Sequence, residues 1–145
     1  MYHHCMIRSL DSILIFVSDL SASLDFYQKL GFGMEKHDSV GLARLGDFVI
    51  HLVDEKHASE NGPAFKQEAE IKPRGAGIYT YVHVERIDLF YKEIVKSGIK
   101  PSSEPKDWPW GNREFAVRDP DGYKYIFYEP HRPDQRHMPK AKLIK

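Results

Sequence analysis

The stretch VSDLSASLDFYQKLGF, from Val17 to Phe32, contains the end of a strand, a short helix and a helix stop. It follows an apolar run, residues 10–18, whose β-branched side chains are typical of a buried strand. Ser18 or Asp19 is a suitable helix N-cap. Apolar residues then recur at helical spacing, at Leu20, Leu24 and Tyr27. Gly31 is placed to end the helix, since glycine readily takes the left-handed conformation of a helix end.

Further elements follow this strand and helix. Three strands are expected at residues 32–38, 40–45 and 48–54, with a tight turn at Gly46-Asp47. A second strand and helix are expected at residues 78–84 and 86–96, and later strands at residues 99–103, 113–118 and 123–128. Asp119-Pro-Asp-Gly122 fits a type I turn before the last strand.

A weak internal repeat relates the two halves of the chain. One constant shift superposes Val17 on Val84 and Gly31 on Gly98, and it aligns the apolar positions of the two helices. Any two strand–helix units look alike at this level, but the order, lengths and glycine stops agree together. The repeat predicts one domain over residues 10–130, with modules at residues 10–54 and 78–130.

The rest of the chain is expected to lie outside the modules. Residues 55–77 are polar, contain Gly62-Pro63 and Pro73, and show little periodicity, so they are interpreted as a linker. Residues 1–9 form an N-terminal extension, and residues 131–145 form a basic C-terminal tail.

Composition excludes several classes of protein. Lys and Arg balance Asp and Glu over the 145 residues, so the chain offers no basic footprint for nucleic acid. One cysteine, Cys5, cannot form an intrachain disulfide or a cysteine-based zinc site. No apolar run is long enough for a membrane helix, and the N-terminus lacks the apolar stretch of a signal peptide. We therefore expect a cytoplasmic protein without nucleic-acid or membrane partners.

Two motifs resemble the vicinal oxygen chelate superfamily, which includes glyoxalase I and the bleomycin-resistance proteins. The first is the stretch from Val17 to Phe32, and the second is WGNREFAVRDPDG, from Trp110 to Gly122, which is similar to the closing motif of the bleomycin-resistance branch. The resemblance implies an α+β fold of two βαβββ modules that form a curled mixed sheet with a cleft. It also implies a homodimer, with each cleft built partly from both subunits.

The resemblance places the superfamily's metal-ligand positions at Ser12, His51, Tyr79 and Ile126. Only His51 is a strong ligand, whereas metal sites of this kind normally use three or four His, carboxylate or thiolate donors. We therefore expect no metal and no other cofactor. A shifted site that uses His51 and His83 is the less favoured alternative.

The positions that would surround a metal then become candidate ligand contacts. The expected ligand-binding residues are Ser12, His51, Tyr79, Tyr81, Trp108, Trp110 and Tyr128. Trp110 matches the tryptophan that lies beside the drug's planar rings in bleomycin-resistance proteins, and a tryptophan ring can stack on a planar or cationic group. For Trp108 we favour a structural role, as a hydrophobic latch toward a neighbouring subunit. Glu114 and Arg118 are expected to form structural ion pairs beside the turn.

The sequence thus favours a metal-independent small-molecule binding protein that sequesters a planar or amphipathic ligand, of which an antibiotic is one candidate. We expect no catalytic residues, because no nucleophile with an orienting base is visible. The alternative is a metal-dependent glyoxalase-like lyase or isomerase, or an extradiol-type dioxygenase. A third reading is a partner-binding module that uses residues 55–77 and the basic tail.

Overall fold

The structure, a computed structural model, describes residues 6–131. It divides into two compact units, Met1–Lys72 and Pro73–Lys145, which are described separately. Cys5 and residues 132–145 of the expected tail lie outside the described residues.

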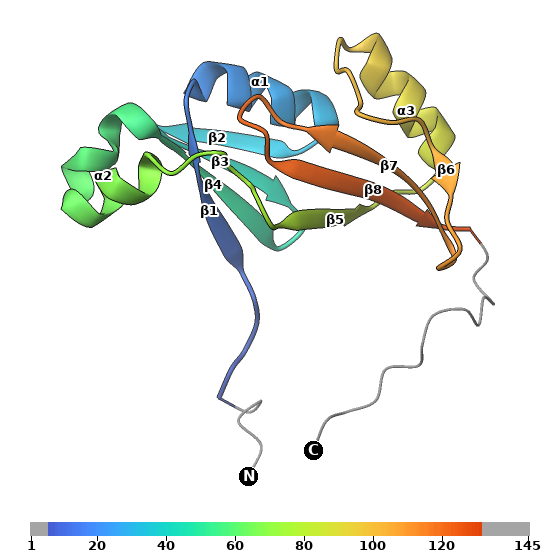
Figure 1. The fold of residues 1–145 in the computed structure, drawn as a ribbon, viewed down its shortest axis with the longest axis horizontal. Helices are drawn as coiled ribbons and strands as arrows, with labels where there is room; N and C mark the ends of the chain where they lie inside the picture. The colour runs from blue at the N-terminus through green and yellow to red at the C-terminus, as the bar shows by residue number, and fades with distance from the viewer. Residues whose placement is uncertain (1–5, 132–145) are drawn as a thin grey trace. The chain divides into compact units, whose positions relative to one another are not determined.

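The first unit is a four-stranded mixed sheet with one long helix (Figure 1). Its elements are β1 (Ser12–Val17), α1 (Leu20–Leu30), β2 (Gly33–His37), β3 (Val40–Leu45) and β4 (Phe48–Asp54). The strand order is β1-β4-β3-β2, with β1 parallel to β4 and the other pairs antiparallel. The order of strand, helix and three strands is the one predicted for the first module.

Local chemistry sets both ends of α1. Asp19 is the N-cap, and its Oδ1 accepts a hydrogen bond from the backbone N–H of Ala22 at 3.1 Å. Gly31 ends the helix with φ +103°, in the left-handed region, and its N–H donates to the carbonyl of Gln28. Both predicted boundaries of the helix are therefore confirmed.

We expect Gly31→Ala to lower the free energy of unfolding by about 1 kcal/mol, because an L-residue is strained at positive φ. A Cβ at this position would meet no atom within 4 Å, so backbone strain is the only cost. Urea unfolding of Gly31→Ala and Gly31→Asn measures the effect. Asparagine tolerates the left-handed region, so Gly31→Asn should lose less stability. Equal losses in the two variants would contradict this account.

The second unit repeats the same order of elements. It contains β5 (Tyr79–His83), α3 (Ile87–Lys96), β6 (Lys106–Asp107), β7 (Asn112–Arg118) and β8 (Lys124–Pro130). Its sheet has the order β5-β8-β7-β6, with β5 parallel to β8, which matches the topology of the first sheet. The predicted α+β architecture of two βαβββ modules is confirmed.

Each unit has its own apolar core between its sheet and its helix. In the first unit, Val17, Leu52 and Tyr27 are fully buried. In the second unit, Phe90 of α3 lies over Phe115 and Phe127, with ring centroids 6.0 and 5.0 Å apart. Because side chains alternate along a strand, the residues between these core positions point to the opposite face of the sheet.

Two parts of the chain differ from the sequence-based expectation. Residues 99–103 do not form a strand; the edge strand is the shorter β6. Two features interrupt the ladder here. The Oγ of Ser103, and not a backbone carbonyl, accepts the N–H of Ala116. Pro101 and Pro105 have no N–H to donate to a neighbouring strand. Residues 55–77 contain a 3-10 helix, η2 (Glu55–Asn61), and a short helix, α2 (Pro63–Ala69), which are too brief for their periodicity to be visible in the sequence.

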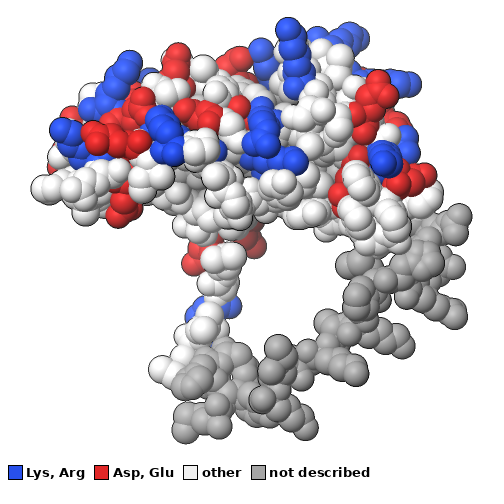
Figure 2. Space-filling view, viewed as in Figure 1, with Lys and Arg blue, Asp and Glu red and all other residues white. Residues whose placement is uncertain are grey.

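Within residues 6–131, no helix is long and apolar enough to cross a membrane. Figure 2 shows Lys and Arg side chains intermingled with Asp and Glu on the visible face, in agreement with the formal net charge of zero.

Candidate functional site

The sheet of the second unit has an aromatic and polar face opposite α3. Phe115 and Phe127 pack toward the helix, so the residues that alternate with them lie on the other face. In register across the strands, this face carries Tyr79 and Lys124, then Tyr81, Ile126 and Ala116, then His83, Tyr128 and Glu114. Three predicted ligand contacts, Tyr79, Tyr81 and Tyr128, are therefore brought onto one surface.

The aromatic side chains of this face contact one another. The rings of His83 and Tyr128 stack with centroids 5.1 Å apart and planes 17° apart. Tyr81 meets Tyr128 edge to face at 6.0 Å, and the ammonium group of Lys124 lies 4.2 Å from the ring centroid of Tyr79. Tyr79 and Tyr81 remain more than half exposed, so their rings are available to a ligand.

A pocket of about 290 Å³ opens beside this face, between the sheet and the segment that leads into β6. Its lining residues are Ser102, Ser103, Glu104, Lys106, Trp108, Glu114, Phe115, Ala116, Lys124 and Ile126. Ligand sites are typically concave, with apolar walls and a few placed polar groups, and they measure about 300–1,000 Å³. The pocket is therefore suited to a small organic molecule.

Two stacked tryptophans stand at one side of the pocket. The rings of Trp108 and Trp110 lie 4.7 Å apart with planes 13° apart. Trp108 is the ring that lines the pocket, and the ammonium group of Lys106 lies 4.4 Å from its centroid. The motif predicts ligand stacking by Trp110 and a latch role for Trp108; in the structure Trp108 lines the pocket and Trp110 stacks on it.

Glu114 also lines the pocket, although it is not among the ligand contacts expected from the sequence. Its side chain is buried, and its Oε2 accepts hydrogen bonds from Trp110 Nε1 at 2.9 Å and from Asn112 Nδ2 at 3.2 Å. The expected ion pair with Arg118 is not formed, because Arg118 donates instead to the carbonyl of Gly122 at 2.9 Å. Glu114 therefore orients Trp110, and the signal for it was the Trp-x-x-x-Glu spacing within the closing motif.

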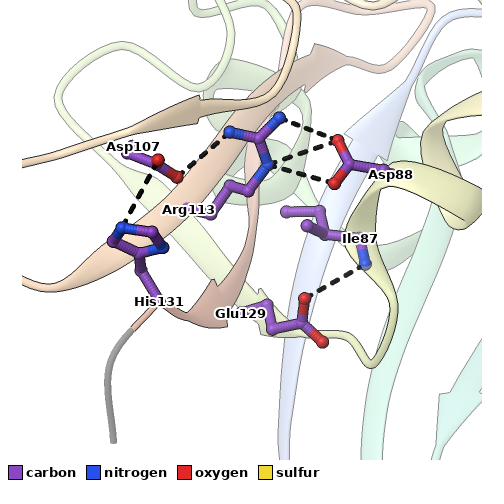
Figure 3. Close-up of polar contacts among 6 residues, drawn as sticks. All are labelled: Ile87, Asp88, Asp107, Arg113, Glu129 and His131. Carbon is purple, nitrogen blue, oxygen red and sulfur yellow. Dashed lines mark hydrogen bonds and ion pairs between the residues drawn. The ribbon is translucent and has the colours of Figure 1, made fainter.

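Charged side chains hold the ends of the tryptophan loop, residues 107–111 (Figure 3). The guanidinium of Arg113 lies between Asp88 on α3, at 2.9 Å, and Asp107 on β6, at 3.0 Å. His131 Nε2 lies 3.4 Å from the other oxygen of Asp107. The hydrogen bonds to Asp88 and Asp107 raise the pKa of Arg113 above its usual range, so the cation is retained. This network fixes β6, β7 and the start of α3 around the loop.

Glu129 makes a separate contact at the N-terminus of α3. Its carboxylate accepts the backbone N–H of Arg86 at 2.6 Å and that of Ile87 at 3.4 Å. Since the first N–H groups of a helix have no partner within the helix, a carboxylate there satisfies them and complements the helix dipole. The helix is thereby attached to the end of β8.

Partial desolvation of its half-exposed side chain is the main cause that raises the pKa of Tyr81 above its ordinary value of 10.0, and the charges of Glu114 and Tyr79 raise it further. We expect Tyr81 to stay protonated beyond pH 10, as a neutral hydroxyl that can donate to a ligand. A raised pKa in the folded state stabilises the fold below pH 10, and that contribution is lost as the pH rises through the folded value.

NMR titration of the tyrosine ring signals measures this pKa. The Glu114→Gln variant should lower the pKa of Tyr81 only in part, because the partial desolvation remains. A wild-type value at or below 10 would contradict the assigned environment.

The other two predicted contacts belong to the first unit. Ser12 and His51 lie on the face of that sheet opposite α1, and the residues in register with His51 are Leu14 and Leu42. Ser12 is exposed and His51 is partly buried. Neither lines the tryptophan pocket of the second unit.

A metal requires several donors that converge on one point. In the described part of the chain, no group of three or more His, Cys, Asp or Glu side chains is arranged to hold a metal ion. The four positions that the resemblance assigned to ligands carry a hydroxyl, an imidazole, an exposed phenol and the buried hydrocarbon of Ile126. His83, which the alternative site would require, is stacked on Tyr128. This donor set does not fit a divalent metal.

A second hollow, of about 480 Å³, lies in the first unit and is polar. Three of its four carboxylates have local partners: Asp19 caps α1, Asp54 caps η2, and Glu60 pairs with His57 at 2.9 Å. These side chains are used to support the ends of helices, so the pocket of the second unit is the better candidate for ligand binding.

Comparison with known proteins agrees with this fold. The family model of the Glyoxalase/Bleomycin resistance protein/Dioxygenase superfamily matches residues 9–127, and the chain belongs to this superfamily. Its relatives include the bleomycin resistance proteins of Geobacillus stearothermophilus and Staphylococcus aureus. Each is 32% identical over 124 residues, which cover 78% of this chain and 90% of the relative.

Solved structures show the same fold. A glyoxalase/bleomycin resistance protein/dioxygenase from Nocardioides has a TM-score of 0.73 at 21% identity, covering 98% of this chain and 96% of its own. A family enzyme from Burkholderia phytofirmans has a TM-score of 0.70 at 17% identity, covering 83% and 97%. The predicted superfamily and its bleomycin-resistance relatives are confirmed.

Proposed function

We propose that the protein is a metal-independent binding protein that sequesters a planar or amphipathic organic molecule. The observation that carries this proposal is the pocket of the second unit, where Trp108 lines the wall, Trp110 stacks behind it and Glu114 fixes Trp110 by a hydrogen bond. A rigid, partly exposed aromatic pair of this kind binds planar groups by offset stacking.

The bleomycin resistance relatives support a binding role over a catalytic one. The side chains of this pocket provide stacking surfaces and fixed charges, and the Oε2 atom of its buried carboxylate, Glu114, accepts from two N–H donors. A general base needs a free acceptor within reach of the substrate proton, and a nucleophile needs an adjacent base. Sequestration requires neither.

The same proposal includes a homodimer. The sheet faces opposite the helices expose large apolar side chains, among them Leu14 at 46%, Tyr79 at 56% and Tyr81 at 54%. A partner subunit and a ligand together would cover such surface, and a two-fold assembly would close it. Light scattering coupled to size exclusion tests this part, and a monomer at micromolar concentration would contradict it.

Elemental analysis tests metal independence. Protein purified without a chelator or a metal-binding tag is analysed before and after incubation with Zn²⁺, Mn²⁺, Ni²⁺ and Fe²⁺. The proposal predicts near-zero occupancy throughout. About one metal per chain in the wild type, lost in His51→Ala, would instead favour a metal-dependent enzyme of the superfamily, because such catalysis uses the cation to polarise substrate oxygens.

A further inference from the structure

We infer that the pocket of the second unit selects a planar ligand that carries an anionic group, which Lys106 and Lys124 bind. This inference rests on the proposed function, because it names the ligand class of the same site. The two lysines enter from different strands, β6 and β8, and both line the pocket. Trp108 lies in the same wall and supplies the stacking surface.

Both ammonium groups lack a carboxylate partner among the described residues. Lys106 Nζ is placed over the ring of Trp108 and Lys124 Nζ over the ring of Tyr79, at 4.4 and 4.2 Å from the ring centroids. Arg113 of the same unit, in contrast, is paired with Asp88 and Asp107. A cation held over an aromatic face keeps its charge and can still bind an anion from the side away from the ring.

The two carboxylates of the pocket do not cancel this preference. Glu114 is 5% exposed, and its Oε2 already accepts from Trp110 and Asn112. Glu104 is exposed, so water screens its charge. The remaining groups that can donate to a ligand include the two ammonium groups and the hydroxyl of Ser103, whose Oγ accepts from the N–H of Ala116.

The lysines also sit where a stacked ligand would present a substituent. Lys106 Nζ lies over the ring of Trp108, so a planar ligand that stacks on this face displaces the ammonium group, which then lies at the edge of the ligand. Lys124 on β8 is in register with Tyr79 on the neighbouring strand β5. A flat aromatic body with a carboxylate at its edge satisfies both features, and a cationic body would meet two like charges.

Three naphthalene probes of the same size test the inference: 2-naphthoate, 2-naphthamide and 2-naphthylmethylammonium. Binding is measured on the full chain by quenching of tryptophan fluorescence and by calorimetry, at low and at high salt. We expect 2-naphthoate to bind about tenfold more tightly than the amide, since each partly exposed ion pair contributes a factor of up to about five. The ammonium probe should bind most weakly, and added salt should narrow the differences.

Variants identify the groups responsible. Lys106→Met and Lys124→Met keep the alkyl chain and remove the charge, so each should reduce the preference for 2-naphthoate over 2-naphthamide, and the double variant should abolish it. Lys92→Met, an exposed lysine on α3, is the matched control and should leave the preference unchanged. Melting temperatures of all variants are compared to confirm folding, and affinity for the uncharged amide reports an intact pocket.

The outcomes separate this inference from the proposed function. Equal binding of the three probes, or the tightest binding for the ammonium probe, would overturn the anionic preference and leave the binding pocket standing. A preference for 2-naphthoate that survives in the double variant would overturn the role of the two lysines. Failure of all three probes to bind would overturn both the inference and the proposed planar-ligand site.

Discussion

Replacing Phe127 with Ala is expected to lower the free energy of unfolding by about 3–5 kcal/mol, the range for deleting a buried aromatic side chain. Phe127 is 1% exposed on β8, and its ring lies 5.0 Å from that of Phe90 and 5.4 Å from that of Phe115. These three rings join α3 to the sheet, so removal of the central one leaves a cavity that rigid strands cannot fill.

Phe127→Leu is the matched control for this prediction. It retains most of the apolar volume and should cost less than the alanine variant. Urea unfolding with a two-state fit gives both values. A loss below about 1 kcal/mol for Phe127→Ala would show that this layer is loosely packed. Since β8 also presents Lys124 and Ile126 to the pocket, the alanine variant should weaken ligand binding as well.

Replacing Trp108 with Ala is expected to weaken binding of a planar ligand by about 1–3 kcal/mol, or roughly fivefold to 150-fold, as for an aromatic anchor at an interface. Trp108 lines the pocket, so its removal deletes the stacking surface directly. Calorimetry with 2-naphthoate provides the measurement. An unchanged affinity would remove Trp108 from the site.

Two further variants make the result specific. Trp110→Phe keeps a ring behind Trp108 but removes the N–H that donates to Glu114, so it should weaken binding less than Trp108→Ala. Leu89→Ala removes an exposed apolar side chain from α3 and should have no effect on affinity. Equal losses in Trp108→Ala and Leu89→Ala would indicate a general loss of folding.

The repeat made most of the fold predictable from the sequence. The N-cap at Asp19 and the glycine at Gly31 set the helix ends by local backbone chemistry, which neighbouring residues encode directly. The edge strand β6 could not be located in this way. Before β6, the side chain of Ser103 accepts the N–H of Ala116 where a strand would use a backbone carbonyl. A side-chain hydrogen bond of this kind does not change the hydrophobic periodicity of the sequence, so the sequence does not reveal it.

The site was predictable in its residue types but not in its arrangement. The Trp-Pro-Trp sequence drew attention to the loop before β7, because large aromatic residues are rarely placed at random in polar loops. Which tryptophan lines the pocket depends on how the loop is held, and the contacts of Arg113 with Asp88 and of His131 with Asp107 join residues that are distant in the sequence. The burial of Glu114 likewise follows from packing.

The most direct test of the proposal that the tryptophan site binds its ligand without a metal is an NMR titration of the indole N–H signals in the presence of EDTA. The chain contains two tryptophans, so Trp108 and Trp110 give two indole signals that report on the pocket separately. The account predicts that 2-naphthoate shifts both signals in a saturable manner, with the chelator present throughout. Indole signals that stay unchanged at saturating probe, or that respond only after a divalent metal is added, would contradict it.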